Sequence, residues 1–102
     1  MLSRIFAALA DPTRRGIFDD LQAAPHTVTE LAAKHPVSRP AVSQHLKTLE
    51  TAKLVYATPK GSHRIYAVRP DGLEQLRRYL DGVWDEALAA YGAEISNLNK
   101  TR

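Results

Sequence analysis

Apolar residues recur every three or four positions along most of the chain, which is the spacing of one buried face of an α-helix. Together with capping signals, this spacing predicts four helices before residue 52. The first spans about residues 2–10. The second begins after Asp11-Pro12, where a capping carboxylate precedes a proline at the first helical position. Its apolar residues are Ile17, Phe18 and Leu21.

The next two helices are short and closely spaced. Thr27-Val28-Thr29-Glu30 matches a capping box and predicts a helix from near Val28. This helix should end after Lys34, because Pro36 disfavours helical geometry in the residue before it. Ser38-Arg39-Pro40 then caps and opens another helix. Its apolar positions form one stripe, made of Val42, Leu46 and Leu49.

The pattern changes after the fourth helix. Two β-prone runs, Leu54–Thr58 and His63–Val68, flank Pro59-Lys60-Gly61-Ser62, where glycine can supply a positive φ. They predict a β-hairpin with a basic tip. From Asp71 to about residue 95 the helical spacing returns, which predicts one amphipathic helix of about 37 Å. A globule of this length has a radius of gyration near 13 Å, so one end of the helix should extend beyond its own core.

The apolar stripe of this last helix widens after Val83 to include Trp84 and Leu88. This widening predicts two buried faces, one against the chain's own core and one against a second chain. Gly92 is a candidate end of the helix, because glycine weakens helical interiors.

The order of elements predicts a mainly α fold with a small β-hairpin, of the winged helix-turn-helix type. A length of 102 residues suits one domain over residues 1–102. A composition of 44% hydrophobic and 25% charged residues argues against a disordered chain or a membrane protein. The apolar run Ile5–Ala10 is too short for an export signal, so we expect a cytoplasmic protein with no membrane partner.

Charge is unevenly distributed along the chain. The net charge is +3, but residues 34–69 carry seven basic residues against Glu50 alone, a local charge of +6. A solvated surface would intersperse the two signs, so this block favours a polyanionic partner. The basic residues are Lys34, Arg39, Lys47, Lys53, Lys60, Arg64 and Arg69.

The fourth helix carries side chains suited to a DNA major groove. Arginine can pair with guanine O6 and N7, glutamine with adenine N6 and N7, and lysine with phosphate. A solvated helix face is the alternative for any one of these residues alone. His45 lies to the side of the face, where its ring could donate to a phosphate. The outer face consists of Arg39, Pro40, Ser43, Gln44, Lys47 and Thr48.

At these residues the sequence resembles the ArsR/SmtB family of bacterial winged-helix transcriptional regulators. The matching stretches are Phe6–Arg15, Val28–Ala32 and Ser38–Leu49. The resemblance implies a homodimer joined through residues 1–10 and 71–95, with the fourth helix of each subunit in successive major grooves. The dimer contacts we expect are Ile5, Phe6, Leu9, Leu80, Val83, Trp84, Leu88 and Tyr91. The DNA contacts we expect are Ser38, Arg39, Pro40, Ser43, Gln44, His45 and Lys47, with Lys60, His63 and Arg64 from the wing.

Two features depart from the family pattern. Lys53 stands where a glycine often closes the fourth helix, so the exit from that helix is expected to differ slightly. Metal-sensing members use cysteines or a histidine and carboxylate set, and this chain has no cysteine at all. Asp81 and Asp85 lie one turn apart, but a solvated acidic face explains them better than a metal site. We therefore expect no metal and no cofactor.

The predicted function is a dimeric, sequence-specific DNA-binding regulator, a repressor that occupies a pseudo-palindromic operator. The chain contains no nucleophile elbow, P-loop or dinucleotide fingerprint, which argues against an enzyme. The alternative is a protein-interaction module that docks a partner through its C-terminal helix. Trp84, Leu88 and Tyr91 suit either function, because a dimer seam and a docking face look alike in sequence.

Overall fold

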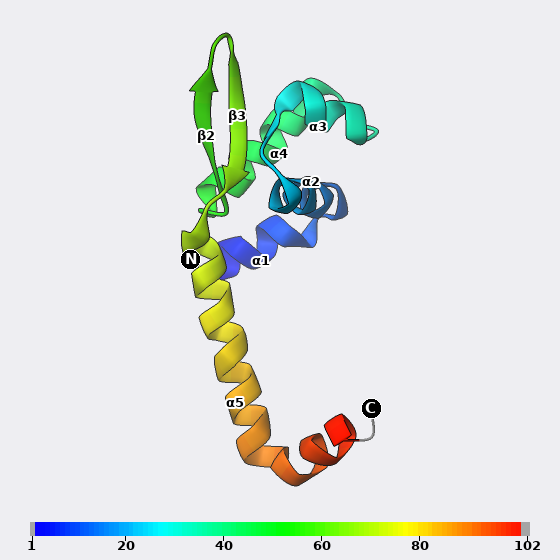
Figure 1. The fold of residues 1–102 in the computed structure, drawn as a ribbon, viewed down its shortest axis with the longest axis vertical. Helices are drawn as coiled ribbons and strands as arrows, with labels where there is room; N and C mark the ends of the chain where they lie inside the picture. The colour runs from blue at the N-terminus through cyan, green and yellow to red at the C-terminus, as the bar shows by residue number, and fades with distance from the viewer. Residues whose placement is uncertain (1, 101–102) are drawn as a thin grey trace.

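The computed structural model describes the backbone of residues 2–100 and the side chains of residues 2–92. Within this range five helices and three short strands follow one another along the chain (Figure 1). Their order confirms the winged helix-turn-helix predicted from the sequence. The elements are α1 (Leu2–Ala10), α2 (Pro12–Ala23), β1 (His26–Thr27), α3 (Val28–Lys34), α4 (Arg39–Thr51), β2 (Val55–Lys60), β3 (His63–Val68) and α5 (Pro70–Lys100).

The capping signals set the helix starts as predicted. The Asp11 carboxylate accepts from the Arg14 amide at 2.9 Å, and Pro12 is the first residue of α2. At α3 the capping box is complete, because the Glu30 amide donates to the Thr27 hydroxyl at 3.2 Å and the Thr27 amide donates to the Glu30 carboxylate at 2.8 Å. At α4 the Ser38 hydroxyl is the cap, because it accepts from the Ala41 amide.

One hydrophobic core joins the first four helices to the base of the hairpin. The apolar stripe of α4 is fully buried in it, as its spacing predicts. Residues from α1, α2, α3 and both strands of the hairpin join it in the cluster, and Leu73 and Leu76 at the start of α5 pack on its edge. The core residues are Ile5, Ala8, Ile17, Phe18, Leu21, Leu31, Val42, Leu46, Leu49, Ala52, Leu54, Val55 and Tyr66.

The sheet has one strand that the sequence analysis did not predict. β1 pairs antiparallel with β3, with His26 opposite Tyr66, so the strand order is β1-β3-β2. A strand of two residues carries no detectable alternation, and its pairing joins positions far apart in the sequence. Thr27, the second residue of β1, is also the cap of α3, so the pairing of β1 fixes the beginning of that helix against the hairpin.

Two residues turn the backbone through positive φ. Gly61 has a φ of 61° and forms the turn of the hairpin together with Ser62, while Lys60 belongs to β2. Lys53 has a φ of 60° just after α4. Lys53 itself therefore adopts the left-handed conformation that a glycine often supplies at this position.

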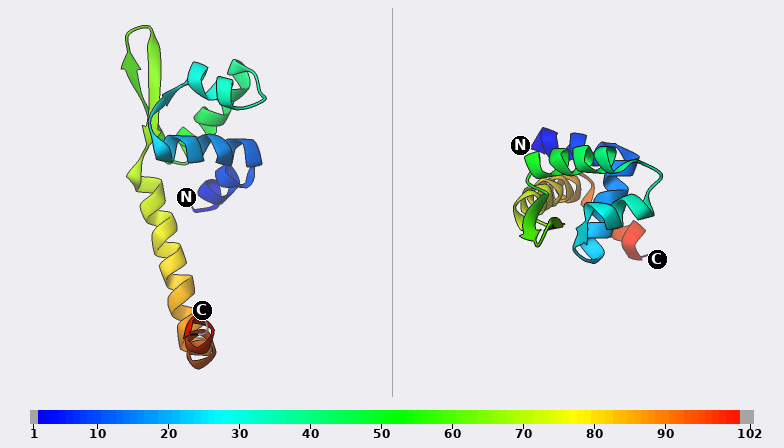
Figure 2. Two further views of the ribbon diagram at one scale, coloured as in Figure 1. Left: turned by 45° about the vertical axis from the view of Figure 1, so that its right-hand side comes forward. Right: turned by 90° about the horizontal axis from the view of Figure 1, so that it is seen from above.

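Helix α5 leaves the core and extends away from it, opposite the hairpin (Figures 1 and 2). The chain has a radius of gyration of 17.2 Å and a longest extent of 56 Å, so the predicted overhang is confirmed. Tyr91 has a non-helical φ of −129° and kinks α5 beside Gly92, the candidate end of the helix. Searched along the described part of the chain, no helix is long and apolar enough to cross a membrane.

One expectation for α5 is wrong for the single chain. Val83 and Trp84 do not face the chain's own core, because α5 has already left the core at that point, and their side chains are 46% and 51% exposed. Among the α5 residues whose side chains are described, Leu73 and Leu76, nearer its start, pack against the core.

Candidate nucleic-acid interface

Helix α4 separates its buried stripe from a polar outer face. Because successive residues turn by about 100°, the side of α4 opposite Val42, Leu46 and Leu49 points away from the core. Five predicted contacts lie exposed on this outer face, namely Arg39, Pro40, Ser43, Gln44 and Lys47. The face can therefore meet a large ligand without moving the core.

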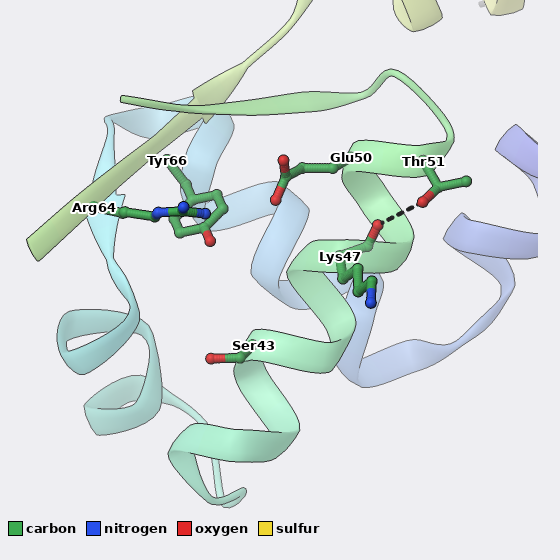
Figure 3. Close-up of a pocket in the computed structure, with 6 residues that line it drawn as sticks. All are labelled: Ser43, Lys47, Glu50, Thr51, Arg64 and Tyr66. Carbon is green, nitrogen blue, oxygen red and sulfur yellow. Dashed lines mark hydrogen bonds between the residues drawn. The ribbon is translucent and has the colours of Figure 1, made fainter. Parts of the chain in front are cut away.

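A groove of about 520 Å³ separates α4 from the hairpin. Figure 3 shows Ser43 and Lys47 on successive turns of α4, with Arg64 and Tyr66 reaching from β3 into the space beside the helix. Glu50 and Thr51 close the groove toward the end of α4. Because Glu50 is the one carboxylate among these lining residues, the Ser43 and Arg64 end is the better place for an anion.

A second groove continues the first toward α3. It shares Ser43, Arg64 and Tyr66 with its neighbour and adds hydroxyl groups from α3 and the hairpin turn. Hydroxyl and guanidinium donors along a continuous groove suit the oxygens of a phosphate backbone. The residues that complete it are Thr27, Val28, Thr29, Ser62 and His63.

The carboxylate of Glu30 accepts a hydrogen bond from Thr27, which lines this second groove. The Thr27 amide, followed by the Thr27 side chain, holds the pKa of Glu30 below its ordinary value of 4.5, and the positive charge of Lys60 lowers the pKa further. The Glu30 carboxylate therefore stays ionised while it caps α3.

The predicted DNA contacts fall into three groups. Ser43, Lys47, His63 and Arg64 line the two grooves, whereas Arg39, Pro40, Gln44 and Lys60 are exposed outside them. Ser38 is engaged as the cap of α4, where its hydroxyl accepts from the Ala41 amide at 3.3 Å.

The ring of His45 points in a direction different from the one predicted. Its ring is partly buried, and Nδ1 lies 3.4 Å from a guanidinium nitrogen of Arg14, on α2. The expectation of a ring directed at a phosphate is therefore replaced by a contact within the chain. The helical position of His45, between the buried stripe and the outer face, left both orientations open.

Several lining residues were not predicted from the sequence. Thr27 and Thr29 stand out in the sequence only through the capping box of α3, and Ser62 only through its place beside the turn glycine. Tyr66 gives no signal, because its contribution depends on how β3 packs beside α4.

A second surface runs along α5 and part of α1. Tyr79, Leu80, Val83, Trp84 and Tyr91 are large apolar or aromatic residues that are each about half exposed. Phe6 of α1 packs edge-on against Tyr79, with the ring centroids 5.4 Å apart. Leu9 and Leu88 are partly buried. Tyr79 was missed in the sequence analysis.

Ile5 does not belong to this surface. Its side chain is fully buried in the core of its own chain, so it offers no area to a second molecule. The helical spacing of α1 is compatible with either face being covered, and the tertiary structure turns Ile5 and Ala8 inward.

The structure brings no metal-binding cluster together among the residues it describes, in the sense of three or more histidine, cysteine, aspartate or glutamate side chains. Asp81, one of the two carboxylates weighed for such a site, lies 3.8 Å from the Arg77 guanidinium.

Comparisons with known proteins agree with this geometry. Residues 9–55 match a family model described as a helix-turn-helix domain. The chain is 51% identical to the HTH-type transcriptional regulator Rv2034 of Mycobacterium tuberculosis, over 92% of this chain and 88% of that protein. It is 32% identical to the transcriptional repressor SdpR of Bacillus subtilis, over 72% of this chain and 81% of that protein.

Solved structures show the same architecture. An ArsR-like transcriptional regulator from Rhodococcus sp. RHA1 superposes with a TM-score of 0.74 at 36% identity, and the match covers 87% of each chain.

Proposed function

The chain belongs to the ArsR family of DNA-binding helix-turn-helix transcriptional regulators, which are not enzymes, and from this premise we propose that it is a homodimeric repressor of a pseudo-palindromic operator. Each subunit would place α4 in one of two successive major grooves, with its hairpin over the flanking backbone. As a regulator of transcription it would act in the cytoplasm, where bacterial DNA lies.

One observation carries the DNA-reading part of the proposal. The outer face of α4 presents Gln44 and Arg39 to solvent, and the adjoining groove collects Ser43 and Arg64. Glutamine and arginine can recognise base edges, while the groove donors suit phosphates. Base-reading and backbone-binding groups therefore lie side by side.

Exposed apolar residues support the dimer. Trp84 and Leu80 are 51% and 53% exposed on a helix that stands away from its core. A row of such residues on one surface is typical of a protein interface. The edge contact between Phe6 and Tyr79 continues that surface onto α1, so both helices can meet a second copy.

The repressor assignment rests on a relative, since SdpR is described as a transcriptional repressor. A repressor needs only to occupy its operator, and the described surfaces suffice for that. We also propose that regulation does not use the cysteine metal site of the family, because the chain contains no cysteine to supply a thiolate.

Operator selection combined with a salt titration tests the proposal. The full chain selects duplexes from a random library, and its affinity for a selected duplex and a scrambled duplex is then measured. A dimer with about 6–10 phosphate contacts should lose about 10³–10⁵ in affinity between 50 and 200 mM salt. It should also prefer the selected sequence.

Light scattering on the same sample discriminates the alternative. A particle of twice the chain mass supports the dimer. A monomer without affinity for any duplex would contradict the proposal and favour a protein-interaction module.

A further inference from the structure

The side chain of Arg14 lies where three helices meet. It extends from the first turn of α2 toward the end of α1 and the middle of α4. Neither the DNA-reading face nor the exposed apolar surface uses it. We infer that Arg14 and His45 are positioning residues that fix the orientation of the recognition helix α4 relative to α1.

The guanidinium holds the last turn of α1. Nε donates to the Ala8 carbonyl at 2.6 Å, and Nη2 donates to the Ala7 carbonyl at 3.1 Å. Carbonyls in the last turn of a helix have no partner within that helix, so these bonds satisfy acceptors that would otherwise need water. The planar guanidinium makes both contacts at once and thereby fixes the direction of α1 relative to α2.

The remaining nitrogen reaches α4. Nη1 lies 3.4 Å from Nδ1 of His45. Arginine is only a donor, so His45 Nδ1 must accept and the ring proton must reside on Nε2.

These contacts of Arg14 with α1 and with His45 form a bridge between the helices, and the backbone of Arg14 is itself held in place. The Arg14 amide donates to the Asp11 carboxylate and is the largest cause of the lowered pKa of Asp11, to which the positive charge of the Arg14 guanidinium adds. Asp11 keeps the first turn of α2, and with it the Arg14 backbone, in place.

The bridge joins the two surfaces that the proposed function needs. On one side α1 carries Phe6, which packs on Tyr79 within the apolar surface proposed for a second copy. On the other side α4 carries the reading face. The view along the long axis in Figure 2 shows α1 and α4 as neighbours, and the two helices are in contact.

Small errors at this junction matter because α4 is long. At 1.5 Å per residue each end of its 13 residues lies about 9 Å from His45, so a tilt of about 20° at that point moves the end by roughly 3 Å. That displacement equals about one base-pair step of a duplex. In a dimer, a loosely held α4 would therefore tolerate the wrong separation between half-sites.

This inference rests on the proposed function, and its test separates the two. His45→Leu removes the acceptor, whereas His45→Asn retains an oxygen near the position of Nδ1. Leucine is the better helix former of the two. A loss caused only by helix stability would therefore be larger in the asparagine variant, and a loss caused by the missing acceptor would be larger in the leucine variant.

The probes are three duplexes derived from a sequence that the wild-type protein selects: both half-sites at their selected spacing, the same half-sites with one base pair inserted between them, and one half-site alone. The wild type should discriminate strongly against the insertion. His45→Leu should lose about fivefold of that discrimination, the effect of one missing hydrogen bond, with unchanged affinity for the single half-site. His45→Asn should resemble the wild type.

Each other outcome is informative. Equal losses on all three duplexes would mean that His45 touches DNA directly, and unchanged discrimination in His45→Leu would show that the bridge positions nothing. Either result overturns the inference and leaves the proposed function standing. A wild type that binds no duplex overturns both.

A spectroscopic measurement without DNA provides the second readout. Because the chain has no cysteine, Lys47→Cys gives a single site for a spin label on α4. Pulsed electron resonance then reports the distance between the two labels of a dimer. The distribution should broaden in His45→Leu and stay narrow in His45→Asn, and equal widths in both variants would overturn the inference.

Discussion

The amide of Gly72 donates to the carbonyl of Lys53 at 3.0 Å, and this contact attaches the first turn of α5 to the exit of α4. Lys53 is the residue with positive φ that turns the chain from α4 into β2. The direction in which α5 leaves the core therefore depends on a close approach of two backbones.

Gly72→Ala should destabilise the protein. An added Cβ would lie 2.7 Å from the Lys53 carbonyl oxygen and 2.9 Å from Cδ2 of Leu54, and backbone atoms cannot move aside cheaply. We expect a loss of about 1–3 kcal/mol in the free energy of unfolding, measured by urea denaturation.

Gly82→Ala is the matched control, because nothing lies within 4 Å of its added Cβ. It lies on the opposite side of α5 from Leu80 and Trp84, and should stabilise the helix by up to about 1 kcal/mol. Equal effects of the two substitutions would refute the close approach at Gly72.

Lys53→Gly should stabilise the protein. The left-handed conformation costs a residue with a side chain about 1–2 kcal/mol, and glycine loses about 0.5–1 kcal/mol through its freedom in the unfolded chain. The net gain should be about 0.5–1 kcal/mol. Lys47→Gly, inside α4, makes the same exchange where φ is helical and should destabilise. A lower free energy of unfolding for Lys53→Gly than for the wild type would contradict the strain at Lys53.

The reading face should separate base contacts from phosphate contacts. Gln44→Ala and Arg39→Ala should each relax base preference at one position by about 1–3 kcal/mol. Lys60→Ala should weaken binding to all sequences alike, because it removes a phosphate contact. Affinities for single-base variants of a selected duplex measure both effects. Equal losses on selected and random duplexes would reject base reading by Gln44.

The apolar surface of α5 should hold the dimer. Trp84→Glu places a charge in the middle of that surface and should give monomers by sedimentation, because a buried unpaired carboxylate is costly. Arg78→Glu introduces the same residue on another side of α5 and should leave the dimer intact. A dimeric Trp84→Glu protein would show that this surface is not the seam.

Stability should fall in acid through the helix caps. The lowered pKa of Glu30 means that its carboxylate stabilises the fold above pH 4.5, and this contribution is lost as pH falls through the lower folded value. Glu30→Gln keeps an acceptor and removes the charge. It should therefore melt below the wild type at pH 7 and approach it near pH 3, and a constant difference would contradict the charge effect.

The sequence by itself determined the helices and where they begin. The caps at Asp11, Thr27 and Ser38 join groups three residues apart, so each can be recognised without knowledge of the fold. The stripe on α4 likewise follows from spacing along one helix. The reading face could be predicted for the same reason, since it is the side of α4 that the stripe leaves outside.

Only the tertiary structure decided which neighbour covers each remaining side chain. Helical spacing shows which residues share a face but not what packs against it, so Ile5 went inward and His45 turned to Arg14. The pairing of His26 with Tyr66 and the groove beside Arg64 join distant segments. Such contacts form when separate elements pack together, so patterns within a short stretch of sequence cannot predict them.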